Sequence, residues 1–248
     1  MDNLKKIVVV LLFVSILFVP ALYSQIKVDV ETGAVFSGYN DVRIPGDSGT
    51  LFSLSEELQA DSEFFYRIRL FYDFNPRHHL GVLFAPLSIN STGQLDHDLV
   101  FFGETFPAQT PLTTTWMFNS YRLIYRYDFL RREKLELGIG FTAKIRDALI
   151  RVEGNGLEAE KTNVGFVPIL HFRAKWWLSD RLALLLDGDA LAAPQGRAED
   201  VLAALMLQVN DHIEFKAGYR LLEGGADNDE VYNFALVHYA SFGAVVSF

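Results

Sequence analysis

Apolar and polar side chains alternate with a period of two along most of the chain. The clearest segment runs from Phe64 to Phe74, where one face is aromatic and aliphatic and the other carries Arg67, Arg69 and Asp73. A period of two is the mark of a β-strand whose two faces meet different surroundings. The pattern therefore predicts strands over most of the chain.

The same alternation recurs further along, and polar connections separate the alternating segments. These segments are 121–129, 135–146, 168–178, 182–190, 213–221 and 231–248. Short turns fall at 75–79, 130–134, 179–181 and 210–212, and longer polar segments at 43–62, 91–114, 153–163, 194–200 and 223–230. Four short and five long connections predict ten strands, with both ends of the domain on the short-turn side.

Two local features disturb this pattern. Pro86 and Pro168 fall inside predicted strands, where a proline removes a ladder hydrogen bond and needs a bulge or a rim position. The segment 200–209, DVLAALMLQV, alternates poorly and is compatible with a helix. Eight strands is the alternative if that segment is not a strand.

The first 24 residues have the pattern of a secretory signal peptide. Two lysines precede a 13-residue run, Ile7 to Val19, which is apolar except for one serine and is too short to span a bilayer as a helix. We expect cleavage near Ser24, with a cut after Ala21 as the alternative. Residues 25–248 are then expected to form a single domain.

The last predicted strand continues to the final residue. Counting back in twos from Phe248 gives Val246, Ala244, Phe242 and Ala240, all apolar or small. This ending resembles the closing strand of bacterial outer-membrane β-barrels, and the resemblance implies that the barrel assembly machinery reads Phe248. It also implies an all-β, antiparallel up-and-down transmembrane barrel, surrounded by outer-membrane lipids in a diderm bacterium.

Composition is consistent with an exported barrel and excludes other classes of protein. The chain is 50% hydrophobic and 14% aromatic, and aromatic side chains gather at strand ends, as interfacial girdles do. A net charge of −9 argues against a nucleic-acid partner, and the absence of cysteine excludes disulfides and a lipoprotein anchor. The alternative is a soluble barrel with its apolar face inward, which would not need both a signal segment and a terminal Phe.

In a membrane barrel the charged face of each strand points into the lumen. The predicted lumen charge network consists of Asp29, Glu31, Arg67, Arg69, Asp73, Arg122, Arg126, Asp128, Glu136, Lys144, Arg146, His171, Arg173, Lys175, Asp187, Asp189, Glu214, Lys216 and Arg220. These charges should pair, because leaving one partner of a buried pair alone costs about 3–5 kcal/mol. Since a ten-stranded barrel is little wider than an eight-stranded one, which side chains fill, we predict a largely closed lumen.

Three other polar motifs are better explained as ordinary loops. The GDSG sequence at 46–49 matches the surroundings of a chymotrypsin-type serine, but no His and Asp framework accompanies it. Asp96-His97-Asp98 could supply a general base or half a metal site, yet residues one apart do not converge on one ion in an extended loop. The acidic segment 227–230 lacks the spacing of a calcium loop. We predict no metal and no cofactor.

Three functions remain open. We favour a non-enzymatic barrel with a structural role or a role in binding an extracellular ligand through its loops. A small channel or transporter is the second, and requires a continuous wet path. The third is an outer-leaflet hydrolase or lipid-modifying enzyme using a rim carboxylate and His97, His171 or His238. The omptin surface proteases share the predicted strand number, but no motif here corresponds to their catalytic residues.

Overall fold

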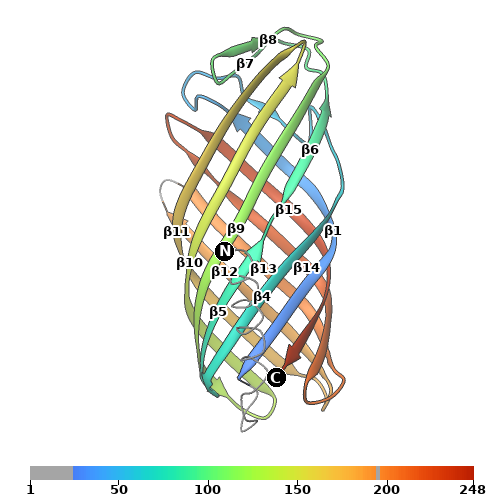
Figure 1. Cartoon of the computed structure of the whole chain (residues 1–248), viewed down its shortest axis with the longest axis vertical. Coiled ribbons are helices and arrows are strands. Elements are labelled where there is room, and N and C mark those ends of the chain that lie inside the picture. Colours follow the sequence, from blue (N-terminus) through green and yellow to red (C-terminus); the bar gives the residue numbers. More distant parts are fainter. Residues whose placement is uncertain (1–24, 194–195) are drawn as a thin grey trace, which may run out of the picture.

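A computed structural model describes residues 25–193 and 196–248, so the predicted signal segment lies outside the described residues. Ten long antiparallel strands close into one barrel (Figure 1). In order around the wall they are β1 (Ile26–Arg43), β4 (Glu63–Asn75), β5 (His78–Ala85) continued by β6 (Ser88–Gly93), β9 (Leu112–Arg131), β10 (Leu135–Gly154), β11 (Leu157–Trp177), β12 (Leu182–Ala193), β13 (Gly196–Gln208), β14 (Ile213–Asp227) and β15 (Tyr232–Ser247). The predicted ten-stranded antiparallel barrel is confirmed.

Closure comes from the first and last strands. Lys27 of β1 lies opposite Ser247 of β15, and the ladder between these strands continues to Arg43 and Tyr232. The backbone N–H of Phe248 donates to the carbonyl of Ile26 at 2.9 Å. Both ends of the barrel domain therefore meet at the end that carries the short turns, as predicted. No described residue belongs to a helix long and apolar enough to cross a membrane.

The ambiguous segment 200–209 is extended and forms most of β13, so its helical interpretation is wrong. Its inward side chains Leu202, Ala204 and Met206 pack against Ala183 and Leu185 of β12. Because an apolar cluster lines this part of the lumen, both faces of β13 are apolar. The alternation that marks the other strands is therefore hidden here.

The two prolines occupy places where the ladder is already interrupted. Pro86 separates β5 from β6, and both pieces pair with the same strand, β9. Pro168 lies within β11 opposite Ala143 of β10, but pairing of β11 with β12 begins only at Leu170. On the side that faces β12, Pro168 has no ladder partner. A strand accepts a proline at such a position, because the missing N–H breaks no hydrogen bond there.

The prediction of a long loop is wrong at three places, because the strands there continue beyond the segments in which apolar and polar residues alternate. The segments 153–163, 196–200 and 223–230 lie largely within β10, β11, β13 and β14, and positions 194 and 195 of the second predicted loop lie outside the described residues. Between β10 and β11 the chain turns over Asn155 and Gly156, with φ of 51° and 78°. Positive φ at both positions defines the type I′ hairpin turn that Asn-Gly favours. In this region the outward face carries Arg151 and Glu153, whereas Ile150 and Val152 on the inward face are buried in the hydrophobic core, so the two faces exchange character while the backbone ladder continues.

The segments 43–62 and 91–114 do connect strands, but they are far less polar than predicted. They include β2 (Phe52–Ser53), β3 (Gln59–Ala60), β7 (Leu99–Phe101) and β8 (Glu104–Phe106), and they fold over the loop end of the barrel (Figure 1). We call their buried side chains the apolar cap: Ile44, Phe52, Leu54, Leu58, Leu95, Leu99, Phe101 and Phe106. These connections therefore have a hydrophobic core of their own.

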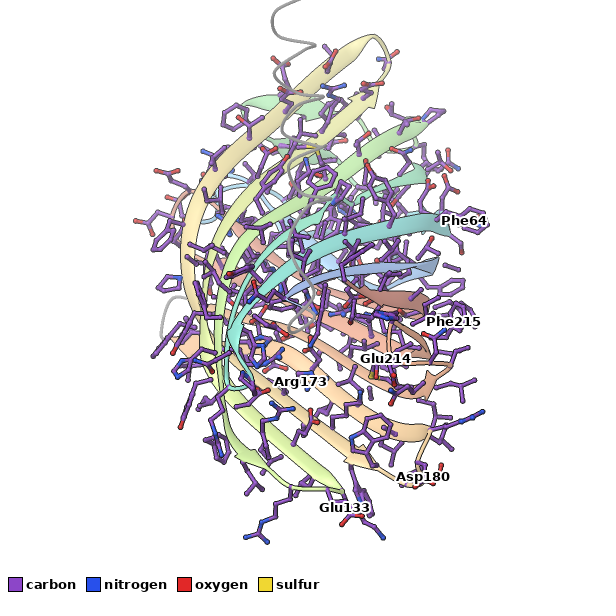
Figure 2. The ribbon with its side chains drawn as sticks, turned by 60° about the horizontal axis from the view of Figure 1, so that its bottom comes forward. Phe64, Glu133, Arg173, Asp180, Glu214 and Phe215 are labelled. Atoms are coloured by element: carbon purple, nitrogen blue, oxygen red, sulfur yellow. The ribbon has the colours of Figure 1, made fainter. Side chains whose placement is uncertain are left out.

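The outer wall is a continuous apolar belt. On β4, the outward row from Phe64 to Phe74 is exposed at every second residue. Figure 2 shows Phe64 and Phe215 projecting from the outside of the ring, whereas Arg173 and Glu214 lie inside it. An exposed apolar surface of this extent marks contact with a partner or a membrane. Lipid around the barrel is the environment that such a belt fits.

Leu70 lies midway along this outward row and tests the belt. We expect Leu70→Arg to lower the free energy of unfolding in lipid vesicles by about 2–4 kcal/mol, since a charge at mid-depth must leave water. Leu51→Arg is the control, because Leu51 is equally exposed but lies in the connection after β1. Equal stability of the two variants in denaturant titrations would show that lipid does not cover this row.

Candidate functional site

Asp200 of β13 is the centre of the lumen. Its carboxylate accepts hydrogen bonds from three guanidinium groups, those of Arg67 at 2.8 Å, Arg122 and Arg220. These residues come from β4, β9 and β14, so one carboxylate ties together strands from opposite walls. We call these four residues the Asp200 cluster. All four are buried.

Asp200 was absent from the predicted network. It begins the segment whose alternation is hidden by the apolar cluster of β12 and β13, so no pattern assigned it to the lumen face. The strand register is the information that would have placed Asp200 in the lumen, because this residue stands opposite Asp189, a predicted lumen residue, on the neighbouring strand.

Glu31 of β1 holds the next layer of the network. Its two oxygens accept hydrogen bonds from Nε and Nη2 of Arg220, at 2.6 and 2.9 Å. Lys216 lies 3.2 Å from the same carboxylate and 2.7 Å from Asp29. A guanidinium bound through two nitrogens has a fixed orientation, so Arg220 is held rigidly between Glu31 and Asp200.

Asp187 and Asp189 of β12 neutralise the facing wall. Asp187 pairs with Arg69 at 3.0 Å. Asp189 contacts Arg122, the hydroxyl of Thr142 at 2.6 Å and Nδ1 of His171 at 3.0 Å. His171 is therefore a buried hydrogen-bonding partner within the network.

Toward the short turns, the network continues through a histidine that was predicted to lie in a turn. His79, at the start of β5, is buried between Asp73, at 2.6 Å, and Asp128, at 2.9 Å. Arg126 pairs with Asp128 of its own strand, at 2.8 Å. Further pairs toward the short turns are Glu136 with Arg173, at 3.4 Å, and Lys175 with Glu214.

Within the described chain, every predicted lumen residue except two has an oppositely charged partner or, for His171, a carboxylate hydrogen bond. The exceptions are Lys144 and Arg146 of β10. Lys144 is 3% exposed and places Nζ 4.5 Å from the centre of the Phe118 ring. Arg146 donates through Nη2 to the side chain of Asn163, and its Nε is buried without a partner.

The cavities of the lumen lie above and below the Asp200 cluster. The upper cavity has a volume of about 410 Å³ and lies between the cluster and the apolar cap. The lower cavity holds about 60 Å³ among residues nearer the short turns, such as Arg69, Asp187 and Lys216. Between them, beside Arg67 and Arg122, a space of about 10 Å³ has room for one water at most.

The other polar motifs form turns and loops. In the GDSG segment the N–H of Gly49 donates to the carbonyl of Pro45, and Ser48 contacts the neighbouring Asp47. His97 hydrogen-bonds Asp96 at 2.8 Å in an exposed loop, and this contact lowers the pKa of Asp96. In the part of the chain that the structure describes, no three or more His, Asp and Glu side chains are grouped so that they could hold a metal ion.

The comparisons with known proteins support the fold. No family model matches the chain, and no curated protein matches it. Its structure is similar to that of the outer membrane protease OmpT from Escherichia coli, with a TM-score of 0.54 and 9% identity over 90% of this chain and 97% of that chain. It is also similar to the transport unit of the autotransporter AIDA-I from Escherichia coli, with a TM-score of 0.51 and 8% identity over 94% of each chain. The chain therefore has the fold of outer-membrane β-barrel proteins.

The Asp200 cluster predicts that a single substitution at its centre lowers the stability of the barrel strongly. Asp200→Asn removes the negative charge that three guanidinium groups share, and we expect it to lower the free energy of unfolding by about 3–5 kcal/mol. Asp211→Asn is the matched control, because Asp211 is exposed in the turn between β13 and β14. A difference between the two variants below about 0.5 kcal/mol in denaturant unfolding would contradict the structure's assignment.

Proposed function

We propose that the protein is an outer-membrane barrel with a plugged lumen, which acts through its loop end in a structural or binding role and does not conduct. The fold, the apolar belt and the aromatic residues at both ends of the strands support a location in the outer membrane. Outer-membrane lipids are then its neighbours along the belt. The exposed Phe248 at the short-turn end is the proposed recognition element for the barrel assembly machinery.

One observation supports the proposal that the lumen is closed. The Asp200 cluster spans the barrel between the upper and lower cavities, and its side chains are hydrogen-bonded across the gap rather than lining a path. An ion crossing this level would have to displace guanidinium groups from a buried carboxylate, which leaves buried charges without partners. This favours the plugged barrel over a small channel.

The positions of the histidines argue against a hydrolase. His171 is buried in the network, His238 lies on the outer wall with Nδ1 2.5 Å from the hydroxyl of Tyr219, and His97 is in a loop. Each therefore has a different environment, and each has a local partner that accounts for its position. A rim site for hydrolysis needs a His and a carboxylate beside one substrate position.

The loop end offers an ordered acidic surface. The apolar cap holds the connections after β1 and β6 in place, and these carry the exposed carboxylates Glu56, Glu57, Asp61, Asp96, Asp98 and Glu104. Further exposed carboxylates lie in the β10–β11 and β14–β15 hairpins: Glu158, Asp227, Asp229 and Glu230. An acidic surface of this kind suits cationic partners, or anionic lipid headgroups through bridging divalent cations. The proposed binding role rests on this surface.

Conductance in planar bilayers tests the plugged lumen. We expect the purified protein to give no steady single-channel steps, because the Asp200 cluster blocks the lumen. The triple variant Asp200→Ala, Arg67→Ala and Arg122→Ala removes three of the four blocking side chains, and we expect discrete steps from it. Steady steps from the unmodified protein would overturn the proposal in favour of a channel.

A further inference from the structure

Beside the upper cavity, the described residues leave one edge of β11 without a ladder. Residues 157–169 of β11 pair with β10, but they have no ladder partner in β12, whose pairing with β11 ends at Leu170 opposite Ala190. In Figure 1, β10 and β11 rise on the left toward the top, beyond the end of β12. At this place the cavity is lined by Phe166 of β11, Arg197 of β13 and Gly225 of β14. We call this break the side opening.

The side opening lies at the upper limit of the apolar belt. The outward side chains of β11 beside it, Val164 and Phe166, are 71% and 67% exposed. Two positions higher, on the same face, stands Thr162, followed by Glu160, where the outward face becomes polar. In a membrane the opening would face the outer part of the lipid layer rather than water above it.

Inside, the upper cavity is mainly apolar. Trp116 and Phe118 stack with ring centres 5.4 Å apart, and Ile150, Leu222 and Val237 also line the cavity. A cavity of about 410 Å³ is in the range of small-molecule binding sites, which combine an apolar lining with a few polar groups.

Two of those polar groups are cations that the protein itself does not neutralise. Lys144 and Arg146 line the cavity from the lumen face of β10, and among the described residues their contacts are the Phe118 ring and the side chain of Asn163 rather than a carboxylate. The other cations at the cavity are paired, Lys161 with Glu230 at 3.2 Å and Arg197 with Glu223. An unpaired buried charge is costly, and an anion bound beside Lys144 and Arg146 would remove that cost.

We propose that the upper cavity binds an anionic amphiphile, with its oxyanion at Lys144 and Arg146 and its alkyl chain against Trp116 and Ile150. The ligand enters from the membrane through the side opening, between β11 and β13. Carboxylate and phosphate headgroups share this chemistry, so both a free fatty acid and a phospholipid with one chain inserted fit the site. The inference depends on the proposed membrane location but not on the closed lumen.

Fluorescence of Trp116 reports occupancy of the site. In a Trp176→Phe, Trp177→Phe background Trp116 is the remaining tryptophan, since the chain has 3. We expect bromine-labelled tetradecanoate to quench it saturably in detergent solution, and the uncharged bromine-labelled tetradecanol to bind about tenfold more weakly or worse. Absence of saturable quenching by the acid and by the lipid vesicles described below would overturn the site.

The variant Lys144→Met tests the role of the charge. It removes an unpaired buried charge, so the barrel should fold at least as well as the parent. We expect its affinity for the acid to fall about tenfold, with its affinity for the alcohol unchanged. Lys134→Met, in the exposed turn before β10, is the matched control and should bind like the parent. Equal affinity for acid and alcohol in the parent, or an unchanged affinity for acid in Lys144→Met, would contradict the proposal.

Vesicles distinguish the two sources of the ligand. In vesicles of phospholipid with bromine-labelled chains, Trp116 quenching without added fatty acid would assign the site to a bilayer lipid. Quenching that appears only after the labelled acid is added would assign it to a free amphiphile. Both results support the oxyanion site if Lys144→Met weakens them. Conductance measured on the same preparation separates failure of this site from failure of the plugged lumen.

Discussion

The structure depends on the neutralisation of charge in a space with little water. Ten strands enclose a lumen too narrow for a solvated core, yet their inward faces carry arginine, lysine, aspartate and glutamate on nearly every strand. Nearly all of these side chains have a partner of opposite charge, and most of the partners lie on another strand, because an unpaired buried charge is costly. The resulting pairs between distant walls, above all those of Asp200 with Arg67, Arg122 and Arg220, hold the cylinder in one arrangement and close it.

The same constraint explains how the two ends differ. Below the Asp200 cluster the pairs continue to the short turns, through His79 and the pair of Lys175 with Glu214. Above the cluster the interior becomes apolar and is covered by the connections after β1 and β6. The upper cavity lies where these two kinds of interior meet, and there Lys144 and Arg146 are left without a carboxylate. A plugged lower barrel and an accessible upper cavity are consistent, because they occupy different levels.

Much of this architecture follows from the sequence, because lipid, water and backbone geometry impose a period of two wherever the two faces differ. Phe64 to Phe74 shows that pattern, and so do most of the paired lumen residues. The pattern fails where the character of a face changes along the strand. Asp200 was missed because β13 is apolar on both faces. The hairpin at Asn155 and Gly156 was missed because above the belt the outward face carries charges while the inward face, with Ile150 and Val152, is buried in the hydrophobic core. Pairing between specific residues could not be predicted, because it depends on the register of strands far apart in sequence, and the apolar cap depends on contacts between two separate connections.

The most direct test of this account is a double-mutant cycle between Arg122 and Asp200, which lie on β9 and β13. The free energies of unfolding of Arg122→Met, Asp200→Asn and the double variant would be measured in the same lipid vesicles and compared with that of the parent. If charge neutralisation holds the barrel together, the double variant should be more stable than the sum of the single effects implies, by about 1.5 kcal/mol or more. Single effects that add within about 0.5 kcal/mol would show that the two side chains do not depend on each other and would contradict the account.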